Sequence, residues 1–101
     1  GIIKLFSPYT LTLEILEDTK VNISKSGNGE VTQLMNQVVS KGDQYIFDFE
    51  STINFEFWSA EHIRMQLNAI PMDNFLSDGG FAIRGSYEAE KSQLYLGFYR
   101  R

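Results

Sequence analysis

The chain has 101 residues, of which 43% are hydrophobic and 14% aromatic, and it contains no cysteine. This length and composition fit one folded domain with its own core. The lack of cysteine excludes disulfides, thiolate metal sites and a cysteine nucleophile. The net charge of −4 disfavours binding to nucleic-acid phosphates and to anionic lipid head groups. The sequence has no apolar run long enough to span a membrane.

The N-terminal part predicts an apolar lead-in followed by strand structure. Residues 1–8 fit an edge strand or a strap over the core, because Pro8 cannot donate a backbone hydrogen bond. Residues 9–17 alternate between apolar and polar side chains, as a half-buried strand does. The alternation changes phase around Glu17–Thr19. This change predicts a bulge or kink within one strand, or else a turn between two strands.

Asn28-Gly29 is the strongest turn signal, because both residues tolerate the positive φ that a type I′ hairpin turn requires. We therefore expect residues 20–25 to pair with residues 30–34. Residues 31–40 fit both a strand and a helical stripe. We favour strand, with Val38-Val39 as a second short strand before a turn at residues 41–43. A helical turn over residues 33–37 is the alternative.

Residues 41–68 contain three consecutive runs in which apolar and polar side chains alternate with a period of two. The apolar positions are Tyr45, Phe47 and Phe49, then Ile53, Phe55 and Phe57, then Ile63, Met65 and Leu67. Each run predicts a strand with one face in the core. The short breaks between the runs predict tight turns, so we expect an antiparallel meander.

The remaining residues predict a loop and two further strands. Residues 69–77 read as a loop that is anchored by apolar side chains, namely Ile70, Met72, Phe75 and Leu76. A turn at residues 78–80 precedes strands at 81–87 and 93–99. Seven or eight short strands predict an all-β fold, which we expect to be a small antiparallel β-sandwich, Ig-like in general shape.

Candidate catalytic groups are sparse. His62 is the only histidine, and neither a nucleophile nor a second metal ligand stands at a motif spacing from it. The carboxylates of Asp48, Glu50 and Glu56 alternate with core residues, which is typical of a solvated sheet face rather than of a glycosidase pair. We therefore expect no catalytic residue, no metal site and no cofactor.

Trp58, Tyr95 and Tyr99 are the candidate partner-binding residues. All three occupy the outward parity of their predicted strands. Exposed aromatic side chains can stack on sugar rings or fill a partner's pocket. The alternative is that they are isolated surface aromatics, which are normal in soluble domains. A carbohydrate-binding module that uses these aromatics is one functional hypothesis.

The leading functional hypothesis comes from a resemblance, and the carbohydrate-binding module is the alternative to it. The order of strands and turns resembles the C-terminal β-domain of RodZ-like bacterial cell-shape proteins. The resemblance is carried by a strand at Thr19–Ile23, a Gly42-Asp43 turn, a strand end at Asn68-Ala69-Ile70-Pro71 and a glycine turn at Asp78–Phe81. The chain departs from the pattern at three places. The family has an aromatic residue at Lys20, Gly-Asn-Ala at Ser59-Ala60-Glu61, and Asn-Gly at Asn68-Ala69.

The resemblance implies that residues 1–101 are a single β-domain from a larger chain. That chain would have a cytoplasmic helix-turn-helix domain and one transmembrane helix. The β-domain would then lie outside the cytoplasm, in the periplasm or at the cell surface, tethered to the membrane. Its implied role is non-catalytic protein interaction that links the cytoskeleton to cell-wall synthesis. Its implied partner is a protein of the cell-wall elongation machinery, or cell-wall glycan.

Overall fold

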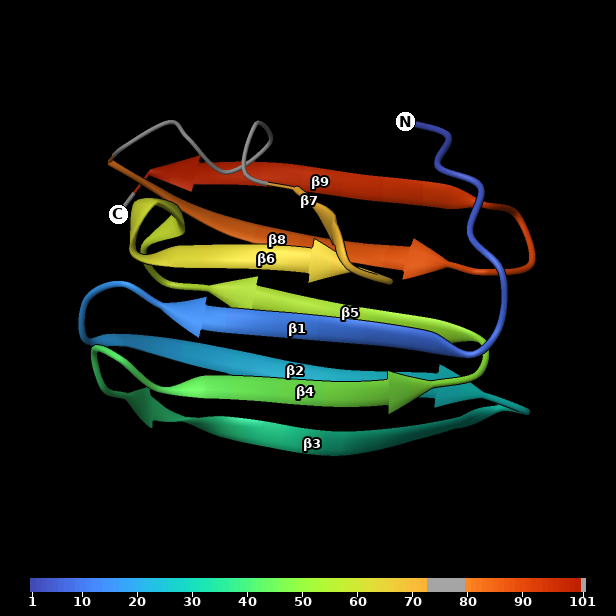
Figure 1. Ribbon diagram of the computed structural model, residues 1–101, viewed down its shortest axis with the longest axis horizontal. Coiled ribbons are helices and arrows are strands. Elements are labelled where there is room, and N and C mark those ends of the chain that lie inside the picture. Colours follow the sequence, from blue (N-terminus) through green and yellow to red (C-terminus); the bar gives the residue numbers. More distant parts are fainter. Residues whose placement is uncertain (73–79, 101) are drawn as a thin grey trace.

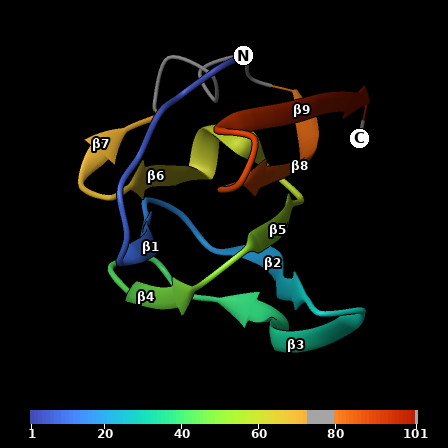
Figure 2. The same ribbon diagram turned by 90° about the vertical axis from the view of Figure 1, so that its right-hand side faces the viewer.

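The computed structural model describes residues 1–72 and 80–100, and these residues form two antiparallel sheets (Figure 1). The strands are β1 (Tyr9–Ile15), β2 (Thr19–Gly27), β3 (Glu30–Val39), β4 (Gln44–Phe49), β5 (Thr52–Phe57), β6 (Ile63–Leu67), β7 (Ile70–Pro71), β8 (Phe81–Glu88) and β9 (Gln93–Arg100). One sheet has the order β4-β1-β6-β7 and the other β3-β2-β5-β8-β9. Figure 2 shows the sheets as two facing layers. The predicted all-β sandwich is confirmed, with nine strands in the described residues rather than seven or eight.

The predicted meander over residues 41–68 is wrong, although each of its three strands exists. β4 and β6 both pair with β1, while β5 pairs with β2 and β8 in the other sheet. The link Glu50-Ser51 therefore carries the chain from one sheet to the other instead of closing a hairpin. Each sheet buries one face, so strands of both sheets show the same alternation of apolar and polar side chains. The alternation therefore cannot show to which sheet a strand belongs. Asp48 and Glu56 consequently lie in opposite sheets and not on adjacent strands.

The change of phase near Glu17–Thr19 marks a turn between two strands and not a bulge. β1 ends at Ile15 in the four-stranded sheet, and β2 begins at Thr19 in the five-stranded sheet. The chain also changes sheet between β5 and β6, through the single 3₁₀ turn η1 (Ala60–His62).

The β2–β3 hairpin is confirmed. Asn28 and Gly29 adopt φ values of 53° and 77°, as a type I′ turn requires. The whole of residues 30–39 is one strand, so the separate strand predicted at Val38-Val39 does not exist. The register shifts between Ile23 and Ser24, which pair with Met35 and Gln33. Leu34 is therefore an extra residue, and it forms a β-bulge.

The core lies between the two layers and is built by the inward residues of the central strands. Fully buried side chains include Leu11, Leu13, Ile23, Ile53, Phe55, Phe57, Met65 and Leu67. The lead-in acts as a strap: Leu5 is buried, Ile2 bridges to Gln93, and the Tyr87 hydroxyl donates a 2.5 Å hydrogen bond to the Ile3 carbonyl. Each buried large apolar side chain contributes about 1.5–3 kcal/mol to stability.

The expected loop after β6 is only partly as predicted. Ile70 belongs to β7 and is 45% exposed, so it is not an anchor, whereas Met72 is buried. Phe75, Leu76 and most of the turn predicted at 78–80 lie outside the described residues. Phe98 lies on the inner face opposite Ile83, but it is 43% exposed because β9 is an edge strand. No helix in the described part of the chain has the length and apolar character to span a membrane.

Candidate functional site

The candidate site lies on the outer face of the five-stranded sheet, over β5, β8 and β9. Ile53, Phe55 and Phe57 of β5 are buried between the sheets. The alternating residues therefore point to the outer face, and Trp58 continues this parity directly after the strand. The exposed fractions of Trp58, Tyr95 and Tyr99 are 49%, 40% and 51%.

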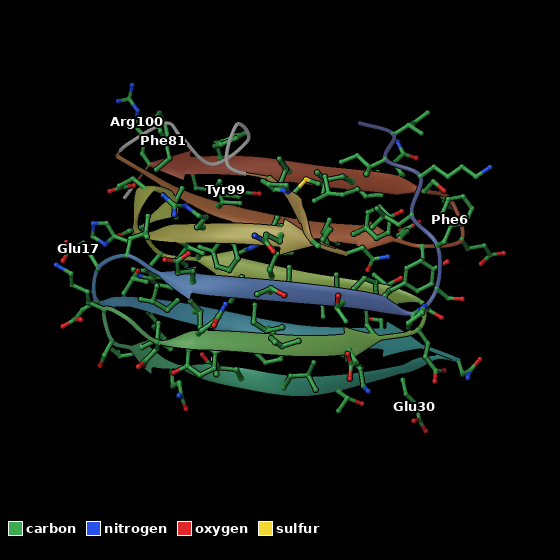
Figure 3. All side chains as sticks on the ribbon, viewed as in Figure 1. Phe6, Glu17, Glu30, Phe81, Tyr99 and Arg100 are labelled. Carbon is green, nitrogen blue, oxygen red and sulfur yellow. The ribbon has the colours of Figure 1, made fainter. Side chains whose placement is uncertain are left out.

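Strand pairing places the three aromatics on one continuous surface. Tyr99 pairs with Ala82 of β8, and Tyr95 pairs with Ser86. Phe57 pairs with Ile83, and continuing that register by one residue puts Trp58 opposite Ala82 from the other side. Ala82 therefore separates Trp58 from Tyr99. Tyr99 lies along β9 (Figure 3).

Two depressions adjoin these rings. One, of about 260 Å³, is lined by Trp58, Ala82 and Tyr99. The other, of about 490 Å³, is lined by Tyr95, Tyr99 and Gly97, and polar residues of β2 and β5 also contribute to it. Tyr99 and the Glu56–Arg84 pair line both depressions. Gly97 is the outward position between the two tyrosines, and it has no side chain to fill the larger depression.

Gly97 positions the Tyr99 ring. A Cβ atom on Gly97 would lie 3.0 Å from the Tyr99 hydroxyl and 3.2 Å from its Cε2 atom. The phenol end of Tyr99 therefore lies against the backbone of its own strand, in space that any side chain on Gly97 would occupy. The ring rests over the sheet while half of the residue stays accessible.

Two cationic side chains, Lys20 and Arg84, lie against the aromatic rings of Trp58 and Tyr99. The Arg84 guanidinium carbon is 5.4 Å from the Tyr99 ring centre, and its Nε atom donates a 2.8 Å hydrogen bond to Glu56 Oε2. The Lys20 ammonium is 5.1 Å from the Trp58 ring centre. These are cation–π distances. The Arg84 side chain is 67% exposed, so its ion pair adds little to stability, and its effect is on the orientation of the side chains.

The floor of the larger depression is polar and ordered. Asn54 Nδ2 donates hydrogen bonds to Ser24 Oγ at 3.2 Å and to Ser26 Oγ at 2.9 Å. At its edge, Gln33 Nε2 donates to Asn22 Oδ1 at 3.3 Å. The depression thus presents amide and hydroxyl groups between aromatic side chains. A ligand with alternating apolar and hydroxylated surfaces matches this combination.

The face carries charges of both signs. Arg84 pairs with Glu56, and Glu88 lies 3.5 Å from the Lys91 ammonium. Lys20 lies against Trp58, and Arg100 also lines the smaller depression.

The other candidates lie elsewhere. His62 is in η1, with its Nε2 atom 3.8 Å from Glu61 Oε1, and it lines neither depression. Within residues 1–72 and 80–100, no group of three His, Asp or Glu side chains is arranged to hold a metal ion.

Sequence reasoning found the three aromatics but missed the residues that support them. Glu56 was interpreted only as a solvated carboxylate, and Arg84, Asn54 and Gly97 were not singled out. The spacing Tyr95-x-Gly97-x-Tyr99 was an available signal, because it places a gap between two outward rings on one strand.

Comparison with protein-family models, with curated proteins and with solved structures finds no match for this chain. The RodZ-like resemblance stays a prediction that rests on short turn motifs.

Proposed function

We propose that this domain is a non-catalytic glycan-binding module, and that its binding surface is the outer face of the five-stranded sheet. The observation that carries the proposal is the convergence of Trp58, Tyr95 and Tyr99 on one face, around depressions with a polar floor. Aromatic rings stack on the apolar faces of sugars, and amides and hydroxyls bond to sugar hydroxyl groups.

The spacing of the aromatics selects an extended ligand. Tyr95 and Tyr99 are four residues apart on one strand, which corresponds to about 13 Å. Trp58 and Tyr99 are separated by β8, so their backbones are about 10 Å apart. A ligand that contacts all three rings must contain several linked sugars. The proposal is therefore an oligosaccharide or polysaccharide chain rather than a monosaccharide.

The amide and hydroxyl groups in the larger depression favour a hydroxyl-rich glycan such as a glucan. The RodZ-like hypothesis implies a protein-interaction role, but it also places the domain beside the growing cell wall, where glycan is present. In that case the domain would be extracytoplasmic, and its ligand would be a peptidoglycan strand or a protein of the elongation machinery. Glucans and peptidoglycan fragments are thus the two ligand sets to test.

The test uses Trp58, the only tryptophan of the chain, as its own reporter. Titration with soluble glucans and peptidoglycan fragments is expected to change Trp58 emission and to release heat in a calorimeter. Trp58→Ala should abolish the heat, and Tyr99→Ala should lower the affinity at least tenfold, or about 1.4 kcal/mol. Phe6→Ala is the matched control, since Phe6 is 74% exposed but lies outside this face.

Two results would contradict the proposal. If wild-type protein gives neither heat nor an emission change with any glycan, the face does not bind glycan, and a protein partner becomes the better hypothesis. If the heat survives when Trp58, Tyr95 and Tyr99 are all replaced by alanine, the glycan binds elsewhere.

A further inference from the structure

β3 forms one outer edge of the five-stranded sheet, at the bottom of Figure 1. Among the described residues it pairs only with β2. Natural edge strands are usually protected by charge, proline, a β-bulge or a covering segment, and of these β3 has the bulge at Leu34. Residues 31–39 contain neither a charged residue nor a proline. The opposite edge, β9, is partly covered, because Ile3 N–H donates to the Ser92 carbonyl at 2.7 Å and Leu94 N–H donates to the Gly1 carbonyl at 2.8 Å.

The register shows which backbone groups of β3 face outward. Trp58 N–H donates to the Lys20 carbonyl at 3.1 Å, so the backbone of Lys20 faces β5. Backbone direction alternates along an antiparallel strand, so every second residue of β2 from Lys20 to Ser26 also faces β5. The β3 residues opposite them must then point their N–H and C=O groups away from β2. These four residues, which we call the edge quartet, are Val31, Gln33, Asn36 and Val38.

The bulge gives the edge quartet a common face. In a regular strand Val31 and Val38 would point to opposite faces, because they are seven positions apart, which is an odd number. The extra residue Leu34 restores the phase, and the whole quartet is exposed on the outer face. Val31 and Val38 are 73% and 71% exposed. The open edge therefore combines free backbone groups with an uncharged row of side chains.

The order of the quartet is self-complementary. We propose that β3 pairs antiparallel with β3 of a second copy of this chain, about a two-fold axis. In the register that we infer, Val31 faces Val38 of the second copy, and Gln33 faces its Asn36. Every other antiparallel register leaves at least one quartet member of each copy without a counterpart. A two-fold contact of this kind uses the same patch on both copies and closes at a dimer.

The inner face supports the same register. Leu34 and Met35 are half-buried at the edge of the core, and the pairing brings Leu34 of each copy opposite Met35 of the other. The two bulges then meet at the axis. The dimer extends the sheet across both copies, so the two aromatic faces lie on one side of one surface.

Sedimentation equilibrium of the purified protein over a wide concentration range tests the dimer. Wild type is expected to show a monomer–dimer equilibrium. Val31→Lys together with Val38→Lys should give a monomer, because two lysines would face two lysines. Val31→Glu with Val38→Lys should restore the dimer, because in this register each glutamate faces a lysine. Ile46→Lys on β4, where Ile46 is 67% exposed, is the control that leaves the dimer intact.

The register is tested by cross-linking, since the chain has no cysteine of its own. Thr32 and Gln37 would face each other as a non-hydrogen-bonded pair, with Cα atoms about 4.5 Å apart, which suits a disulfide. Thr32→Cys with Gln37→Cys should form an intermolecular disulfide on mild oxidation. Thr32→Cys with Asn36→Cys is out of register and should not.

Circular dichroism confirms that each variant is folded, which is expected because all the substituted positions are exposed. The proposal is overturned if wild type is monomeric at every concentration. It is also overturned if the lysine pair leaves the dimer intact, or if both cysteine pairs cross-link equally.

Discussion

The backbone of Gly85 lies directly against the ring of Phe55: a Cβ atom on Gly85 would be 2.6 Å from Phe55 Cε2. The same atom would be 2.6 Å from the carbonyl oxygen of Tyr95 on the next strand. Phe55 in turn stacks on Phe57, with 5.3 Å between the ring centres. The absence of a side chain at Gly85 therefore lets β8 and β9 close over the aromatic part of the core.

Gly85→Ala is expected to lower the free energy of unfolding by about 1–3 kcal/mol, because the added methyl group must displace a packed ring or a backbone carbonyl. Urea unfolding followed by Trp58 emission measures the change. Gly27→Ala is the control, since its Cβ atom would be 3.3 Å from the Ser51 hydroxyl, which can move aside. An equal loss in both variants would contradict this account of Gly85.

Ala69→Gly is expected to raise the free energy of unfolding by roughly 0.5–1 kcal/mol. Ala69 has a φ of 64°, and a left-handed conformation costs a non-glycine residue roughly 1–2 kcal/mol. Glycine removes this cost, but its greater loss of backbone entropy on folding offsets roughly 0.5–1 kcal/mol of the improvement. Denaturant unfolding of the two proteins at one pH measures the difference.

Asn68→Gly is the matched comparison for Ala69→Gly and should be destabilising. Asn68 also has a positive φ, of 49°, but its side chain joins two segments. Its Oδ1 atom accepts a hydrogen bond from Thr10 N–H at 2.8 Å, and its Nδ2 atom donates to the Phe6 carbonyl at 2.8 Å. If both glycine variants change stability in the same direction, relief of backbone strain is not the cause.

Tyr45 makes the stability depend on pH in the alkaline range. Partial burial, followed by the hydrogen bond and the charge of Asp43, raises the pKa of Tyr45 above its ordinary value of 10.0. The Tyr45 hydroxyl donates to Asp43 Oδ2 at 3.0 Å. The unfolded chain therefore loses this proton at a lower pH than the folded protein. The stability that Tyr45 contributes through this proton is fully present below about pH 10. It is lost as pH rises through the pKa of Tyr45 in the folded protein.

Tyr45→Phe should lose less stability than wild type as pH rises above about 10, because it has no phenol proton to lose. At neutral pH it should be less stable than wild type, because the hydrogen bond to Asp43 is gone. Urea unfolding at a series of pH values gives both effects. Asp43→Asn should lower the pKa of Tyr45, which absorbance titration of the phenolate would report. An unchanged pH profile in Tyr45→Phe would show that other groups cause the alkaline loss.

Gly97→Val is expected to weaken glycan binding about tenfold or more, because the new side chain occupies the space of the Tyr99 phenol. Gly97→Ala should have a smaller effect, since one methyl group requires a shift of only a few tenths of an ångström. Tyr99→Phe keeps the ring and should retain most of the affinity. Calorimetric titration with the best glycan ranks the three. Tight binding by Gly97→Val would show that the position of Tyr99 is not critical.

The alternation of side chains located the strands but not their partners. Phe49 and Ile53 both point into the core, and nothing in their spacing shows that they belong to opposite sheets. By contrast, the β2–β3 hairpin was predictable because Asn28-Gly29 determines its turn geometry locally. Pairing between distant strands depends on the whole topology, which no short window of sequence contains.

The dependence on distant strand pairing also explains why the sequence indicated some site residues and not others. Outward parity on a single strand was enough to nominate Tyr95 and Tyr99. The Arg84–Glu56 hydrogen bond joins residues 28 positions apart, so it is visible only once β5 and β8 are known to be neighbours. The importance of Gly97 is visible only once the position of the Tyr99 ring against it is known.

The interleaving of the two sheets also bears on how the chain folds. β1 is made first, yet it ends up between β4 and β6, so its sheet cannot be completed until residues 63–67 are available. Local pairing is confined to the β2–β3, β6–β7 and β8–β9 hairpins among the described strands, and non-local strand order slows folding to milliseconds or seconds. The β2–β3 hairpin can form within microseconds. When the β2–β3 hairpin first forms, both of its edges are exposed: the β2 edge is later covered by β5, whereas the β3 edge stays open in the folded sheet.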